Sequence, residues 1–187
     1  MRNLVLLMHT SLDGFVASEE GGLDWINLDD ELFADVGKLV ESADAALYGR
    51  VTYDMMEGYW PTAGQNPNAT RHDKEHSEWY NRVTKYVVSK GKPATGKKAE
   101  VIGKDLTEEV RKIKSLPGKN ILMIGSPSTA QALIQAGLID EFRINVYPVV
   151  LGKGIPFYPH LNQRVQLALA NAKAYGSGAV GLTYTLK

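Results

Sequence analysis

Short apolar runs and amphipathic stretches alternate along most of this chain. The apolar runs are typical of strands that are covered on both faces of a sheet. They occupy residues 4–8, 45–48, 83–89 and 121–124, and residues 100–102 predict a further short strand. Between these runs, apolar residues recur at helical spacing. This spacing predicts helices over residues 29–43, 50–58, 106–116 and 127–136.

The end of the chain follows a different pattern. Apolar and polar residues alternate over 141–151, 165–173 and 179–186, as in strands with one covered face. The glycines at 176 and 178 favour a hairpin between the last two strands. Residues 176–181 also match the G-x-G-x-x-G pattern of dinucleotide-binding proteins. Because a strand and not a helix follows, we interpret this stretch as a hairpin turn.

These elements predict one α/β domain over residues 1–187. Helices separate the apolar strands, so the central sheet should be mostly parallel and covered by helices on both faces, in three layers. The C-terminal strands should add to one edge of this sheet in antiparallel orientation. A chain of 187 residues is long enough to bury a core without disulfides or metals.

The composition excludes several classes of protein. The chain has no cysteine, which rules out disulfides and thiolate metal sites and agrees with a cytoplasmic location. Its 21 basic residues balance 21 acidic ones, which gives no support to a general role in binding nucleic acid. No apolar run approaches the ~20 residues that cross a bilayer. We therefore expect neither nucleic acid nor a membrane as a partner.

Residues 59–77 are polar and contain two prolines, which predicts a long surface loop with a lid or binding role. His72 and His76 lie in this region and match the H-x-x-E-H pattern of some metallopeptidases. The neighbouring sequence shows no apolar stripe that would hold a metal site rigid. We therefore interpret this stretch as a solvated loop and predict no metal.

Residues 121–137 read as a buried strand, a glycine turn and a helix. Ser126 suits the N-cap, Pro127 the first helical position and Gly137 the end of the helix. Such a turn directs backbone N–H groups, hydroxyls and the positive end of a helix dipole at one spot, which suits a phosphate. An ordinary, well-capped connection between strand and helix is the alternative.

Two other strand ends have similar chemistry. Gly49, Arg50 and Thr52 lie where one strand ends and a helix begins, and Ser89 and Lys90 follow another strand. Parallel strands bring their carboxyl ends to one edge of a sheet, where ligands bind. The three ends would suit the phosphates of a dinucleotide, and Arg50 or Lys90 favours the additional ribose phosphate of NADP. The alternative is that both cations are ordinary surface charges.

Two carboxylates are candidates for the substrate side of such a site. Asp13 follows the first strand and Asp30 lies in the first turn of the first long helix. A partly buried carboxylate with a raised pKa would hydrogen-bond a heterocycle or relay a proton. For Asp30 the alternative is stabilisation of the helix dipole. We predict substrate contacts for Trp25 and Phe33, with core packing as the alternative for Trp25.

Several of these segments together resemble the dihydrofolate reductase-like superfamily. More closely, the chain is similar to the reductase domain at the C-terminus of the bifunctional riboflavin-biosynthesis deaminase/reductase. The resemblance covers nearly the whole chain. Its most specific part runs from residues 137–141 into residues 147–157. Shorter matches lie at residues 11–14, 24–25, 49–53 and 124–126.

This resemblance implies an oxidoreductase that binds NADPH across the strand ends and transfers hydride to a C=N or C=O bond of a small heterocycle. It also implies a homodimer. Asp30 and Asp13 would be catalytic, and Trp25 and Phe33 would bind substrate. The residues implied to bind the cofactor are Gly49, Arg50, Thr52, Ser89, Lys90, Gly125, Ser126, Ser128 and Thr129.

The chain departs from the family pattern at two positions. Riboflavin-pathway reductases have an acidic substrate-binding residue just before the phosphate turn, where this chain has Met123 and Ile124. Ser126 replaces the usual second glycine of the turn. The substrate is therefore left open between the uracil derivative of riboflavin biosynthesis and a pterin of the dihydrofolate type. A non-catalytic module that binds NADP(H) is the third possibility.

Overall fold

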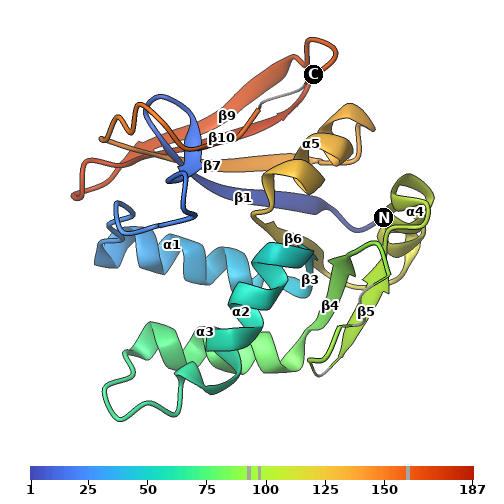
Figure 1. Cartoon of the computed structure of the whole chain (residues 1–187), viewed down its shortest axis with the longest axis horizontal. Coiled ribbons are helices and arrows are strands. Elements are labelled where there is room, and N and C mark those ends of the chain that lie inside the picture. Colours follow the sequence, from blue (N-terminus) through green and yellow to red (C-terminus); the bar gives the residue numbers. More distant parts are fainter. Residues whose placement is uncertain (92–93, 97, 159–160) are drawn as a thin grey trace.

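A large, mostly parallel sheet organises the molecule (Figure 1). The computed structural model describes residues 1–91, 94–96, 98–158 and 161–187. The strands are β1 (Leu4–Ser11), β2 (Phe15–Ala17), β3 (Ala43–Gly49), β4 (Thr84–Val88), β5 (Ala99–Ile102), β6 (Asn120–Ile124), β7 (Glu141–Tyr147), β8 (Ile155–Pro156), β9 (Leu167–Ala174) and β10 (Val180–Leu186). The helices are α1 (Asp30–Glu41), α2 (Arg50–Ala63), α3 (Arg71–Arg82), α4 (Leu106–Ser115) and α5 (Pro127–Gln135).

The order of strands in the sheet is β5-β4-β3-β6-β1-β7-β10-β9. The strands from β5 to β7 pair in parallel, whereas β10 pairs antiparallel with both β7 and β9. This arrangement confirms the predicted α/β fold with antiparallel C-terminal strands. A second, two-stranded sheet of β2 and β8 was not predicted. It joins the turn after β1 to the glycine-rich segment after β7.

Helices cover both faces of the sheet at its central strand, β1. Leu4 and Leu6 belong to a core that includes residues of α4 and α5, whereas Val5 and Leu7 belong to a core with α1, α2 and α3. All four side chains are at most 3% exposed. Burying one such aliphatic side chain contributes roughly 1.5–3 kcal/mol, so the continuous apolar run of β1 is explained by its position between two layers.

The prediction of a loop over residues 59–77 is wrong. Helix α2 continues through Pro61 to Ala63, and α3 begins at Arg71. Thr70 and Asp73 form a capping box at the start of α3, and Trp79 and Tyr80 are buried against the sheet. Tertiary packing of these aromatic residues thus stabilises a helix whose sequence is polar overall.

Other elements end a few residues away from their predicted bounds. The strand predicted over 141–151 ends at Tyr147, since Pro148 follows and lacks the N–H that would continue the ladder. The hairpin interpretation of residues 176–181 is confirmed. The amide of Tyr175 donates to the carbonyl of Ala179 at 2.9 Å, and Gly178 adopts a φ of +83°.

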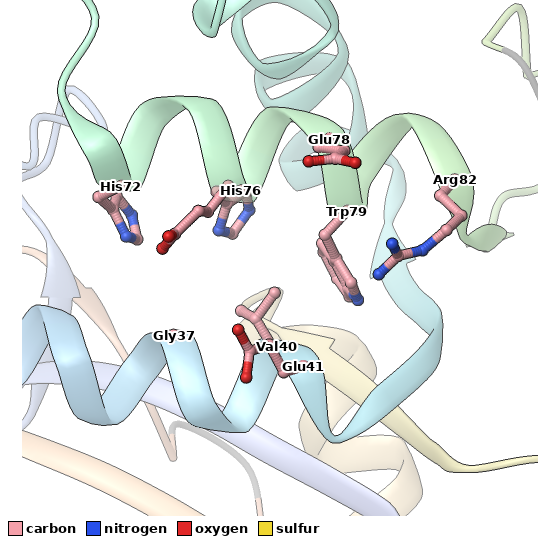
Figure 2. A pocket seen from close by; sticks show the side chains of 9 residues that line it. Gly37, Val40, Glu41, His72, His76, Glu78, Trp79 and Arg82 are labelled. Atoms are coloured by element: carbon pink, nitrogen blue, oxygen red, sulfur yellow. The ribbon is translucent and has the colours of Figure 1, made fainter.

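The histidines of the H-x-x-E-H stretch lie on helix α3, where they face α1 (Figure 2). A hollow of about 130 Å³ separates the two helices at this point. His76 is 5% exposed, its ring packs 3.9 Å from that of Trp60, and neither ring nitrogen has a partner among the described residues. Within the same residues, no cluster of three or more His, Cys, Asp or Glu side chains is placed to hold a metal ion.

The burial of His76 makes the fold sensitive to acid. Desolvation lowers the pKa of His76 from 6.5 to about 3, so the folded protein keeps the ring neutral while the unfolded chain takes up a proton below pH 6.5. Stability is therefore unaffected by this group above pH 6.5 and falls as the pH decreases below it.

We expect His76→Phe to remove part of this acid sensitivity, because phenylalanine fills the same space without titrating. The wild type should lose about 2 kcal/mol relative to the variant between pH 7 and pH 5. Urea denaturation at several pH values measures the difference. The variant keeps His9 and His72, so their contributions cancel. Parallel stability curves for the two proteins would contradict the assignment.

Candidate cofactor and substrate site

The ends of β3 and β6 touch at the carboxyl edge of the sheet. Gly49 precedes α2, and a Cβ at this position would lie 2.5 Å from Cβ of Ser126 and 2.8 Å from Oγ1 of Thr129. Gly125 adopts a φ of +62°, and a Cβ there would lie 3.3 Å from Thr52. The two turns therefore interlock, and only glycine fits at Gly49. The structure thus brings together the strand ends that the sequence predicted would meet.

Helices α2 and α5 begin at these turns without a capping side chain. Ser126 is the N-cap of α5 as predicted, but its side chain makes no capping hydrogen bond, and Gly49 has no side chain to cap α2. The first N–H groups of both helices are thus not satisfied by a cap. Ser126 and Thr129 are buried beside them, and Ser128 is exposed in the first turn of α5. This arrangement suits an anion with several oxygen acceptors.

The end of β4 adjoins the start of α2. Nε of Arg50 donates to Oγ of Ser89 at 3.3 Å, and Nη1 of Arg50 lies 3.2 Å from Oδ1 of Asp54. Its guanidinium also stands 5.5 Å from the ring centre of Tyr53. Lys90 follows Ser89 and is exposed. Arg50 and Ser89 are thus brought beside the two glycine turns, with Lys90 at the adjoining surface.

Asp13 holds two loops together. Its carboxylate accepts hydrogen bonds from Oγ of Ser11 at 2.6 Å and from the amides of Leu151 and Gly152 at 3.1 and 2.8 Å. The bond from Ser11 and those from the amides hold the pKa of Asp13 below its usual value. The raised pKa expected for a proton-relaying acid is therefore wrong for Asp13, because hydrogen bonds to its charged form outweigh desolvation.

The first turn of α1 contains two neighbouring carboxylates with different surroundings. Asp30 is exposed at the start of the helix. Asp29 is the N-cap and accepts hydrogen bonds from the amide of Leu32 at 2.8 Å and of Ser177 at 2.6 Å. These bonds lower the pKa of Asp29 and join α1 to the β9–β10 hairpin. The sequence indicated this cap by an aspartate placed three residues before Leu32, the first apolar residue of the helix.

An aromatic cluster lies between β1, β7 and the segment before α1. The ring of Trp25 packs edge-on against Tyr147, with centroids 5.6 Å apart, and Nδ1 of His9 lies 3.0 Å from the Tyr147 hydroxyl. Trp25 was predicted from the sequence as a substrate contact, whereas His9 and Tyr147 were not. Phe33 lies apart from this cluster among the described contacts, since its ring packs 4.5 Å from His72 of α3.

The strand order and the layers define the dihydrofolate reductase-like fold. Dihydrofolate reductase from Enterococcus faecalis, in complex with NADP(H), superimposes with a TM-score of 0.64 at 16% identity, over 99% of this chain and 96% of that one. The chain belongs to the RibD C-terminal domain family, whose model matches residues 2–180. Among the described residues, no helix combines the length and apolarity needed to span a membrane.

A curated relative and two solved structures are similar to this chain over nearly all of its length. The uncharacterized protein YyaP of Bacillus subtilis is 34% identical over 98% of this chain and 94% of its own. A putative riboflavin biosynthesis protein from Shewanella gives a TM-score of 0.74 at 24% identity, over 100% of this chain and 99% of that one. The deaminase/5-amino-6-(5-phosphoribosylamino)uracil reductase of Thermotoga maritima gives 0.68 at 15% identity, over 100% of this chain and 57% of that one. The family assignment rests on the matching family model, whereas these solved structures show that the fold is shared.

We expect Gly49→Ala to disrupt the contact between the two glycine turns. The added methyl group has to displace Ser126 and Thr129, and overpacking of this kind costs about 1–3 kcal/mol. Gly58→Ala is the matched control on the same helix, because Gly58 is exposed and no atom of the described residues lies within 4 Å of the added Cβ. This control should be neutral or slightly stabilising. Chemical denaturation measures both, and equal stabilities would refute the close approach.

Proposed function

We propose that this protein is an NADPH-dependent reductase that acts on a C=N or C=O bond of a small heterocycle. The observation that carries the proposal is the interlocked pair of glycine turns at the ends of β3 and β6. Each turn opens a helix whose first N–H groups lack a capping side chain. Membership of a reductase family, and a neighbour of the same fold that binds NADP(H), support a nicotinamide cofactor.

The residues at this edge fit the groups of such a cofactor. Backbone N–H groups in the first turns of α2 and α5, with the hydroxyls of Thr52, Ser126 and Thr129, would donate to the pyrophosphate. Arg50 would bind the additional ribose phosphate, since a guanidinium offers paired donors to phosphate oxygens, and Ser89 and Lys90 would lie near it. When bound, NADPH supplies the hydride, and the chain orients the reactants and excludes water.

The substrate side differs from that of a riboflavin-pathway reductase. Met123 occupies the position of the family's acidic residue and is fully buried. Asp30, at the exposed start of α1, is our candidate for binding a heterocycle from the other side. The missing carboxylate is an argument against the uracil derivative of the riboflavin pathway, and it makes a pterin or another pyrimidine the alternative substrate. The cytoplasmic location and the homodimer stay predictions, and light scattering tests the latter.

Assays with NADPH and NADH test this proposal on 7,8-dihydrofolate, a pterin and 5-amino-6-(5-phosphoribosylamino)uracil. Oxidation of NADPH that depends on one of these compounds is the expected result. Binding of NADPH without turnover would favour the non-catalytic module. No binding at millimolar NADPH would overturn the proposal.

The preference for NADPH over NADH should depend on Arg50. We expect Arg50→Gln to weaken NADPH binding about 10-fold or more, because a charge-assisted hydrogen bond to phosphate is lost, and to leave NADH binding nearly unchanged. Arg111→Gln is the control, since Arg111 pairs with Glu108 on the exposed side of α4. Fluorescence titration measures the affinities. An equal loss for both cofactors would assign Arg50 a structural role instead.

A further inference from the structure

His9 lies on β1 between the predicted cofactor turn and the predicted substrate residue Trp25. Side chains alternate along a strand, so His9 shares the sheet face of Val5 and Leu7, which is the face covered by α1, α2 and α3. The amide of Gly125 donates to the carbonyl of Leu7 at 3.3 Å, which places the β6 turn beside this part of β1. His9 is thus the first polar side chain of β1 on that face.

The Tyr147 hydroxyl fixes the tautomer of His9. Tyr147 is 2% exposed, and burial together with the charge of Asp29 raises the pKa of its hydroxyl, which therefore remains protonated. The only hydrogen-bond partner of this hydroxyl among the described residues is Nδ1 of His9, at 3.0 Å. A buried hydroxyl donates its proton where an acceptor is present. Nδ1 therefore accepts, and the ring proton of neutral His9 is on Nε2.

Burial also keeps this ring neutral. It lowers the pKa of His9 from 6.5 to about 4, so the imidazole carries no charge at neutral pH. A neutral imidazole with its proton on Nε2 is a hydrogen-bond donor at that atom and a poor acid, because loss of the proton would leave an imidazolate. The chemistry open to Nε2 of His9 is therefore the donation of a hydrogen bond.

Two N–H groups beside Tyr147 have no acceptor among the residues that the structure describes. No hydrogen bond among the described residues involves Nε2 of His9, and Nε1 of Trp25 is buried without a partner. Both rings pack against Tyr147, with centroids 5.6 Å away in each case. The N–H of Trp25 lacks the acceptor that a buried donor normally has, and His9 is only half-buried, so its Nε2–H is open to a ligand. Together the two donors indicate a ligand with acceptor atoms.

We propose that His9 is a specificity-determining residue whose Nε2–H donates a hydrogen bond to a carbonyl oxygen or ring nitrogen of the substrate. This inference rests on the proposed reductase function and narrows its substrate to heterocycles that present an acceptor at this point, as pyrimidinones and pterins do. The donor also stabilises negative charge that develops on the acceptor as the neighbouring carbon gains a hydride. The balancing proton comes from water, since neutral His9 does not release its own.

Nitrogen-15 NMR of the histidine ring tests the tautomer independently of activity. In the wild type, the shifts and couplings of His9 should show a proton on Nε2 and a bare Nδ1. Tyr147→Phe removes the hydroxyl, and we expect a mixture of both tautomers. Tyr48→Phe is the matched control, because the Tyr48 hydroxyl is also buried but has no hydrogen-bond partner in the described part of the chain. A proton on Nδ1 of His9 in the wild type would overturn the inference.

Binding experiments test the role of the donor. With NADP⁺ at saturation, 7,8-dihydrofolate and 5-amino-6-(5-phosphoribosylamino)uracil are titrated into wild type, His9→Phe and His9→Gln. We expect at least one compound to shift the Nε2 resonance of His9 and to bind about 10-fold more weakly to His9→Phe. His9→Gln keeps an N–H donor and should recover part of this loss. NADPH affinity and thermal unfolding are measured on every variant.

NADPH binding tests the proposed function, and substrate binding by the His9 variants tests the inference about His9. If the wild type fails to bind NADPH, the proposed function is wrong. If NADPH binds equally to all variants but His9→Phe binds both compounds as tightly as the wild type, the inference about His9 alone is wrong. The same conclusion follows if neither compound shifts the His9 resonance.

Discussion

The close approach of β3 to β6 at their carboxyl ends is the constraint on which the rest of the site depends. A methyl group at Gly49 would overlap Ser126 and Thr129, and Gly125 lies against Thr52. This contact forces two helices, α2 and α5, to begin side by side. Their N-termini then point at the same edge of the sheet, so backbone geometry rather than charged side chains creates most of the anion-binding character.

On the predicted substrate side, hydrogen bonds to two carboxylates hold the loops in place. Asp13 joins the turn after β1 to the glycine-rich segment after β7, and Asp29 joins α1 to the β9–β10 hairpin. Both carboxylates are hydrogen-bonded in their charged form, which is why their pKa values are lowered. They therefore act as fixed acceptors that position loops. We therefore propose His9, whose ring is held by Tyr147, and the exposed Asp30 as the groups that contact a substrate.

The sequence contained enough to predict the sheet and, in one half of the candidate site, the meeting of the glycine turns, because both depend on local pattern. Apolar runs such as residues 4–8 mark strands, and Gly125 before Ser126 and Pro127 marks a turn into a helix. The other half depends on contacts between distant residues. His9 and Tyr147 are 138 positions apart, so a histidine in an apolar strand gave no sign of its partner. Helix α3 was missed for a related reason, since its buried face includes His76 and Trp79, which do not read as an aliphatic stripe.

The central claim is that the paired glycine turns bind the phosphates of NADPH. An amide-resolved NMR titration of the full chain with NADPH tests it most directly. We predict that the amide resonances of residues 49–52, 125, 126, 128 and 129 shift together and saturate at one cofactor per chain, while those of the edge strand β9 stay in place. Unchanged resonances in both turns at millimolar NADPH, or shifts confined to another surface, would contradict the account.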